Sequence, residues 1–194
     1  MSDVGHTADE SPARFERIAA MTSAERGQHT MEVVIPIRPY SPDQRAAVLE
    51  LSVRAWSPVF PQTQLAVPTF VYDSFYPHGW EARQVADLAI VLDNEPQNVD
   101  VAMDGTVVTG WVCTRLHPGD RMGEVYVLAV DPDRQRQGVG TALLDHALDR
   151  ARKAGMAMVM VETGDDPGHA PARASYEAAG FDRWPVARYF KRLD

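Results

Sequence analysis

The chain has 194 residues, of which 45% are hydrophobic and 24% charged, a composition typical of one globular domain. Its formal net charge of −8 argues against binding of nucleic acid and mildly favours a cationic partner. No hydrophobic run approaches the roughly 18 residues of a membrane span, and the N-terminus has no hydrophobic signal core, so we expect a cytoplasmic protein that does not bind membranes. The single cysteine, Cys113, lies in a strand-like run and is expected to be buried rather than to carry an acyl group.

Polar residues without a sustained pattern begin the chain, so we expect a flexible or partly helical arm at residues 1–30 and a folded domain over residues 31–194. Hydrophobic periodicity and turn signals then indicate a strand, a helix, an aromatic-rich stretch, a second helix, a hairpin, a strand–helix–strand unit, a short helix and a last strand. The strands are expected at residues 32–38, 98–103, 106–116, 124–130, 156–163 and 185–192. The helices are expected at residues 41–56, 81–93, 138–153 and 171–179, and the aromatic-rich stretch covers residues 57–82.

The order of these elements predicts a mixed α/β (α+β) fold. Asp104-Gly105 between two β runs is a strong hairpin signal, and Gly110 within the second run predicts a bulge or a close backbone approach. The strand–helix–strand unit predicts a right-handed parallel crossover. A mixed sheet with helices on both faces follows.

The stretch QRQGVGTALL, residues 135–144, follows a hydrophobic strand and opens a helix. The first N–H groups of a helix have no partner inside it, and the aligned peptide dipoles place about half a positive charge there. Gly138 and Gly140 allow a close backbone approach or a positive φ, and Arg134 and Arg136 would add charge at the rim. This junction therefore favours a diphosphate.

The spacing of the glycines decides which diphosphate is indicated. The dinucleotide fingerprint needs a third glycine where this chain has Leu143, and the nucleotide P-loop needs Gly-Lys-Ser/Thr, which is absent. What remains, Gln135-x-x-Gly138-x-Gly140, resembles the acetyl-CoA-binding motif of the GNAT superfamily of N-acetyltransferases. A second stretch, APARASYEAAGF at residues 170–181, resembles the family's closing motif, in which a helix with a tyrosine ends in Gly-Phe.

The resemblance implies a GNAT-like, mostly antiparallel mixed sheet with a central parallel strand pair and helices on both faces. It also implies acetyl-CoA as co-substrate, with its diphosphate on the loop amides and its pantetheine along the central strand. His169 stands where the family often has asparagine, and we place it near the pantetheine, with a helix cap as the alternative. The other residues expected to bind acetyl-CoA are Leu128, Ala129, Val130, Gln135, Arg136, Gln137, Gly138, Val139, Gly140 and Thr141.

Direct acetyl transfer to a primary amine requires a base, because an amine with a pKa of about 10.4 is mostly protonated at neutral pH. Glu124 stands eleven residues before Gln135, where the histone-acetylating branch of the family carries its catalytic glutamate, so it is our candidate base. Glu162 is the reserve. Tyr176 matches the tyrosine that donates a proton or hydrogen bond to the CoA sulfur. The alternatives are an ordinary carboxylate at a strand start and a tyrosine packed in a helix–strand interface.

Residues 57–82 are dense in proline and aromatic residues. Because the first two helices of the family and their connection cover the acceptor side, we interpret this segment as the substrate wall; the alternative is that its rings fill the core beneath a loop. The residues expected to contact the acceptor are Phe70, Tyr72, Asp73, Tyr76 and Trp80.

The acidic charge and the aromatic wall favour a small cationic amine as acceptor, and aminoglycoside-type antibiotics are one class that the family serves. A protein N-terminus or lysine is a second hypothesis, and a non-catalytic acyl-CoA sensor is a third. The histidines lack metal-like spacing with cysteine or carboxylates, so we predict no metal. The oligomeric state stays open, with a homodimer as one alternative.

Overall fold

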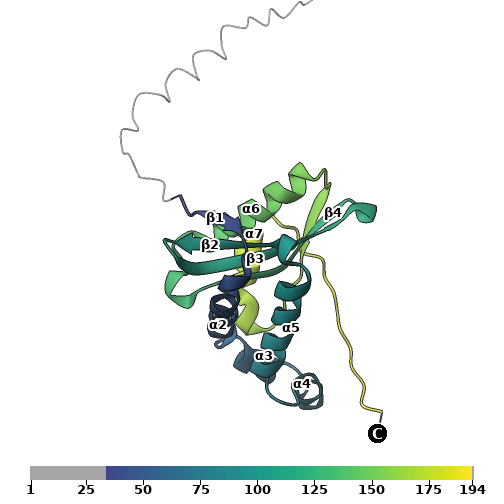
Figure 1. Ribbon diagram of the computed structural model, residues 1–194. Helices are drawn as coiled ribbons and strands as arrows, with labels where there is room; N and C mark the ends of the chain where they lie inside the picture. The colour runs from purple at the N-terminus through teal and green to yellow at the C-terminus, as the bar shows by residue number, and fades with distance from the viewer. Residues whose placement is uncertain (1–33, 194) are drawn as a thin grey trace, which may run out of the picture. The chain divides into compact units, whose positions relative to one another are not determined.

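A five-stranded sheet forms the centre of residues 34–193, the part of the chain that this computed structural model describes (Figure 1). The strands lie side by side in chain order: β1 (Ile37–Pro39), β2 (Val99–Asp104), β3 (Val107–His117), β4 (Met122–Val130) and β5 (Met158–Val161). Pairing is antiparallel from β1 to β4 and parallel between β4 and β5. The predicted mixed, mostly antiparallel sheet with one parallel pair is confirmed.

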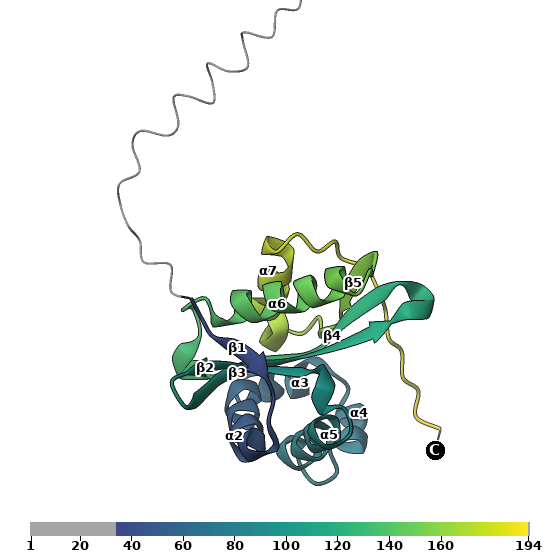
Figure 2. The same cartoon turned by 45° about the horizontal axis from the view of Figure 1, so that its top comes forward.

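Helices cover both faces of the sheet, as predicted. Figure 2 shows α6 and α7 on one side of it and α2 to α5 on the other. Among the described helices, none combines the length and the apolar character that a membrane crossing requires. The α-helices are α2 (Arg45–Trp56), α3 (Phe60–Ala66), α4 (Thr69–Phe75), α5 (Trp80–Asn94), α6 (Val139–Lys153) and α7 (Ala170–Ala178), joined in part by the 3₁₀ turns η2 (Pro42–Gln44), η3 (Pro96–Asn98), η4 (Pro118–Asp120), η5 (Pro132–Arg134) and η6 (Pro167–His169).

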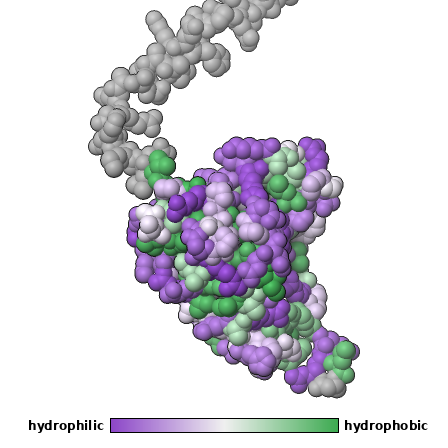
Figure 3. Space-filling model, viewed as in Figure 1, coloured by the Kyte–Doolittle hydropathy of each residue, from purple (hydrophilic) through white to green (hydrophobic). Residues whose placement is uncertain are grey.

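The hydrophobic core has one layer on each face of the sheet. On the α2 and α5 side, Trp111 is fully buried, and its indole N–H donates a hydrogen bond to Ser52 Oγ at 2.9 Å. The Ser52 hydroxyl donates in turn to the carbonyl of Val48 at 2.6 Å, so these buried polar groups are satisfied. On the other side, Leu143 of α6 packs against Val112. Polar residues cover most of the face seen in Figure 3, with smaller hydrophobic patches between them.

Two strand glycines let α6 lie close to the sheet. A Cβ on Gly110 would lie 2.9 Å from both the carbonyl oxygen of Ala129 and Cδ1 of Leu143. A Cβ on Gly123 would lie 2.8 Å from Cβ of Ala151. The β2–β3 ladder also shifts register beside Gly110. Both features predicted for this glycine, a bulge and a close approach, are therefore present.

The N-terminal half differs from the sequence-based expectation in two places. The first strand, expected at residues 32–38, begins only at Ile37, and residues 1–33, including the expected arm, lie outside the described residues. The aromatic-rich stretch at residues 57–82 contains α3 and α4 rather than a long loop. Pro61 at the start of α3 suits the first turn of a helix, where its missing N–H is not needed.

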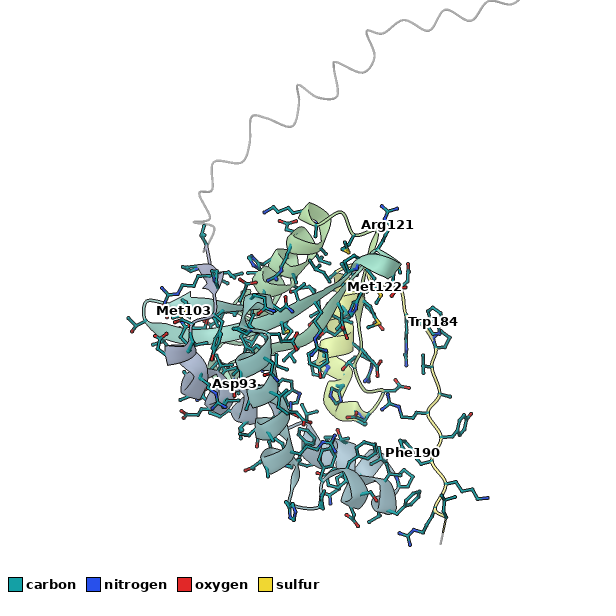
Figure 4. All side chains as sticks on the ribbon, turned by 45° about the vertical axis from the view of Figure 1, so that its right-hand side comes forward. Asp93, Met103, Arg121, Met122, Trp184 and Phe190 are labelled. Atoms are coloured by element: carbon teal, nitrogen blue, oxygen red, sulfur yellow. The ribbon has the colours of Figure 1, made fainter. Side chains whose placement is uncertain are left out.

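The expected last strand at residues 185–192 is wrong, because residues 181–193 form neither helix nor strand. Instead, side chains attach this segment elsewhere: Arg188 binds Glu162 at 3.0 Å, and the ring of Phe190 meets that of Phe75 edge-on, with centroids 5.9 Å apart. Figure 4 shows Phe190 on this extended segment. Alternating hydrophobicity makes a segment suitable for a strand, but pairing is decided by where its side chains find partners.

Candidate active site

The parallel strands β4 and β5 separate after a short ladder. Their pairing ends at Val125 and Val161. The next residue of β4, Tyr126, is an extra residue in the ladder with β3 and forms a bulge. Bulges bend a strand and increase its twist, so β4 turns away from β5 at this point. On the edge of β4 that pairs with β5, residues 126–130 have no strand partner within the described part of the chain.

The loop from β4 to α6 passes twice through the left-handed region, at Arg136 with φ 60° and at Gly138 with φ 86°. Gly138 is the N-cap of α6. The nearest neighbour of a Cβ on Gly140 would be Cγ2 of Val130, at 3.5 Å. The first-turn amides of α6 have no partner inside the helix and carry the positive end of its dipole, so the donors present here fit a diphosphate.

Ion pairs anchor this loop to the neighbouring elements. Arg54 of α2 contacts Asp131, where the loop begins, and Arg134 binds Asp104, the last residue of β2, at 3.0 Å. Arg134, expected at the rim, is therefore held by a carboxylate. Arg136 is exposed and joins none of the ion pairs found within residues 34–193, so it remains the cation at the rim.

The other residues predicted to bind acetyl-CoA differ in exposure. Gln135 and Gln137 are exposed, and their side-chain amides donate to the carbonyls of Val130 at 3.4 Å and Asp133 at 2.9 Å. Thr141 is exposed on the first turn of α6, whereas Val139 is buried. Leu128 and Val130 are half-buried against the α6 side, and Ala129 is buried on the opposite side. Only the main chain of the three strand residues is available along the open edge of β4.

Glu124, the candidate base, lies on β4 one residue before the ladder with β5 ends. Its side chain is 17% exposed, and its Oε2 lies 2.9 Å from Nε2 of His117 on β3. Glu162, the reserve candidate, follows β5, but its side chain is 74% exposed and is bound to Arg188. The structure thus gives Glu124 the more enclosed position.

A second polar pair lies beside Glu124. Arg115, opposite Glu124 in the β3–β4 ladder, binds the carboxylate of Glu95, with one nitrogen–oxygen distance of 2.5 Å. Its guanidinium also stacks on the ring of Tyr126, 3.2 Å from the centroid. The bond to Arg115 lowers the pKa of Glu95 despite partial burial. Burial raises the pKa of the Cys113 thiol to about 12, which supports its structural role.

His117, Arg115 and Glu95 were not predicted as parts of the site. The short loop HPGDRMG between the predicted strands 106–116 and 124–130 favours antiparallel pairing of these strands, and residues two apart on a strand share a face. Counting along β3 would therefore have placed Arg115 and His117 beside Glu124, whereas Glu95, at the end of α5, could be found only from the packing of that helix.

Tyr176 lies on α7, half-buried against the α6 side of the core. Its ring meets Phe181 edge-on, with centroids 5.9 Å apart. Burial raises the pKa of its hydroxyl, which stays protonated at neutral pH and can donate a proton or a hydrogen bond. The ring is therefore packed in the core, as the alternative of a structural tyrosine expected. Its hydroxyl is protonated, as the predicted role of proton or hydrogen-bond donor to the CoA sulfur requires.

His169 immediately precedes α7 and is held by a neighbouring carboxylate. Its Nδ1 lies 2.6 Å from Oδ2 of Asp166, whose side chain is only 8% exposed. Asp166 also accepts from Thr63 Oγ1 of α3 at 3.2 Å and from the amide of Gly168 at 3.0 Å. This network connects α3 to the start of α7, the helix that carries Tyr176.

Three of the five residues predicted to contact the acceptor form one aromatic cluster with Phe60. Phe60 stacks on Trp80 with centroids 4.3 Å apart and meets Tyr76 edge-on at 5.3 Å. Tyr76 lies 4.8 Å from Tyr72. Phe60 and Tyr72 are buried, so these rings pack mainly against one another. This matches the alternative in which the rings fill the core.

Phe70 and Asp73 lie outside this aromatic cluster. The guanidinium of Arg192 lies over the ring of Phe70, 5.2 Å from its centroid. Asp73 is exposed on α4 and takes part in none of the ion pairs found within residues 34–193. A role of these two residues in binding the acceptor stays a prediction.

Residues 54–181 match the family model described as the Acetyltransferase (GNAT) family, a range that includes the glycine loop, Glu124 and Tyr176. The chain belongs to the GNAT family. The GNAT range begins within α2 and ends at Phe181, so it contains every site residue discussed above except those in the last segment.

Relatives within the GNAT family have different acceptors. A mycothiol acetyltransferase of Geodermatophilus obscurus is 37% identical over 103 residues, 50% of this chain and 33% of that protein. A [ribosomal protein bS18]-alanine N-acetyltransferase of Escherichia coli is 41% identical over 71 residues, 36% of this chain and 47% of that protein. The chain therefore spans between a third and a half of these curated relatives.

A solved structure shows the same fold. The aminoglycoside N-acetyltransferase AAC(6′)-Iy in complex with CoA superimposes with a TM-score of 0.56 and 13% sequence identity, over 83% of this chain and 96% of that chain. At this level of identity the likeness concerns the fold and leaves the acceptor open.

Proposed function

We propose that this GNAT protein transfers the acetyl group of acetyl-CoA to the primary amine of a small cationic molecule. The observation that carries the proposal is the separation of β4 and β5 after Val125 and Val161, directly beside Glu124. The glycine loop that follows the same strand supplies the anion site. A carboxylate, an open strand edge and a ring of amide donors thus come from one continuous segment.

Bound acetyl-CoA would supply the acetyl group as a thioester. The amides from Gln135 to Thr141 would hold its diphosphate, since helix N-termini bind phosphate groups without side-chain help. Arg136 would add a positive charge at the rim. The main chain of residues 126–130 would hydrogen-bond the pantetheine in the manner of an added strand.

Two side chains would move protons. Glu124 would accept the proton that the acceptor ammonium must lose before its nitrogen can attack. Tyr176 would donate a proton or a hydrogen bond to the departing sulfur, for which a protonated hydroxyl is required. The main-chain N–H of Leu128, on the open edge of β4, would donate to the carbonyl oxygen as charge develops on it.

The net charge of −8 supports a cationic acceptor, and an aminoglycoside-type antibiotic is the class that we propose first. The N-terminal amine of a protein is the second candidate. It is favoured by the 41% identity with the bS18-alanine enzyme, the highest identity of the relatives described above.

A thiol-release screen with acetyl-CoA tests the proposal. The panel should contain several aminoglycosides, other small amines, and peptides that begin with alanine. Release of CoA with a small cationic amine is the expected result, and turnover of the peptides alone would favour the second candidate. Calorimetric binding of acetyl-CoA without turnover of any amine would instead indicate an acyl-CoA sensor and contradict the enzymatic proposal.

A further inference from the structure

We propose that His117 is a positioning residue for Glu124: its Nε2–H holds one carboxylate oxygen so that the other faces the acceptor amine. The inference rests on the proposed function, because it gives Glu124 the role of base. It concerns a residue that the glycine motif and the closing motif do not include.

The position of the proton follows from the contact. Oε2 of Glu124 and Nε2 of His117 are 2.9 Å apart, a hydrogen-bond distance that requires one proton between them. An ionised carboxylate only accepts, so the proton belongs to His117 Nε2. Oε2 is then engaged, and Oε1 keeps its lone pairs for the amine.

The neighbouring cation Arg115 is engaged with other partners, so His117 is the residue that orients the carboxylate. Arg115 lies opposite Glu124 on β3, but its guanidinium is bound to Glu95 at the end of α5 and stacks on Tyr126 of β4. Within residues 34–193, the side-chain hydrogen bond found for the Glu124 carboxylate is the one with His117.

The two side chains of this pair differ in their exposure to solvent. The side chain of His117 is 39% exposed, whereas that of Glu124 is 17% exposed, so the imidazole lies on the solvent side of the carboxylate.

Two substitutions test the hydrogen bond. His117→Gln keeps an N–H donor on a side chain of similar reach, whereas His117→Leu removes the donor. We expect kcat/KM of His117→Leu to fall about 10-fold to 100-fold at neutral pH. His117→Gln should recover the rate to within about 3-fold of the wild type.

A matched control exists in the same chain. His146 is also paired with a carboxylate, Asp100 at 3.2 Å, and its side chain is 36% exposed, but it lies on α6 and its partner lies on β2. His146→Gln should keep the wild-type rate. Urea unfolding of each variant identifies any loss of rate that comes from instability.

Imidazole nitrogen chemical shifts provide a readout that needs neither acetyl-CoA nor an acceptor. The neutral ring of His117 should be the Nε2–H tautomer in the wild-type protein. The Nδ1–H tautomer, or wild-type kinetics in a folded His117→Leu variant, would overturn the inference while the proposed function stands. Absence of turnover by the wild type with every amine would overturn the proposed function and this inference with it.

Discussion

Asp166 accepts the Nδ1–H of His169 at 2.6 Å and at the same time accepts a hydrogen bond from Thr63 on α3. Thr63 and Asp166 are 103 residues apart in the chain. Each of the three donors offsets part of the cost of burying this carboxylate. The network therefore fixes the start of α7, the helix that carries Tyr176, relative to α3.

Asp166→Ala should destabilise the protein by about 2–3 kcal/mol, because it removes the carboxylate that accepts from His169 and Gly168, while Thr63 keeps the carbonyl of Val59 as an acceptor. Urea unfolding measures the loss. The adjacent Asp165 is the control, since its side chain is 78% exposed and its partner Arg183 is on the surface. Asp165→Ala should change stability by less than about 1 kcal/mol. Equal effects of the two substitutions would contradict the importance of the network.

Stability should fall in acid partly through Asp166. Burial would raise its pKa, but hydrogen bonds from His169, Thr63 and the Gly168 amide outweigh burial and lower it. A carboxyl with a lower pKa in the folded state stabilises the protein above its unfolded pKa of about 4, and the contribution is lost as the pH falls through the folded value. The free energy of unfolding, measured from pH 7 to pH 3, should decrease less steeply in Asp166→Asn than in the wild type.

Glu124→Gln should lower kcat by about 100-fold to 10,000-fold, the usual contribution of general-base catalysis, and should leave the affinity for CoA unchanged. Steady-state kinetics across pH and calorimetry measure the two effects. Glu162→Gln serves as the control, because that carboxylate is exposed and bound to Arg188. A pH profile identical to that of the wild type would remove Glu124 from the role of base.

Gly138→Val should abolish CoA binding. The substitution places a branched side chain at φ 86° where the amides are expected to meet the diphosphate. Gly105→Val is the matched control, since Gly105 also has a positive φ, of 60°, but lies in the β2–β3 turn with open space around it. Undiminished binding by a folded Gly138→Val protein would mean that the diphosphate binds elsewhere.

Gly110→Ala should cost about 1–3 kcal/mol of stability, as overpacked cores do. The added methyl group would meet main-chain and side-chain atoms at 2.9 Å, and the carbonyl of Ala129 cannot move without disturbing β4. Gly119→Ala, in a turn with no atom within 4 Å of the new Cβ, should change stability little. Thermal unfolding of both variants provides the comparison.

Much of this fold follows from local signals that the sequence contains in full. The predicted helices at 41–56, 81–93, 138–153 and 171–179 agree with η2 and α2, α5, α6 and α7 apart from their first and last residues. The glycine loop is equally local, because the positive φ of Gly138 and the start of α6 arise within a few residues of one another. Hydrophobic periodicity and helix-end chemistry act over a few residues, so no distant contact is needed to recognise them.

The limits of the sequence lie where distant segments meet. Trp184 and its neighbours have the composition of a strand, yet this segment is attached through Arg188 and Phe190 rather than by a ladder. The sequence left two alternatives for the aromatic-rich stretch at residues 57–82, a substrate wall or rings that fill the core, and the structure shows that Phe60 and Tyr72 are buried beside other rings. Whether an aromatic side chain binds a ligand or its own neighbours depends on packing across the chain.

The sequence by itself determined the family, the mixed sheet, and the positions of Glu124, Gly138 and Tyr176 along the chain. Only the tertiary structure decided that His117 bonds Glu124, that Arg134 is held by Asp104, and that Asp166 joins α3 to α7. The physical reason is range: backbone conformation and helix dipoles arise from neighbouring residues, whereas a hydrogen bond between side chains requires two separate elements to lie within about 3 Å of each other.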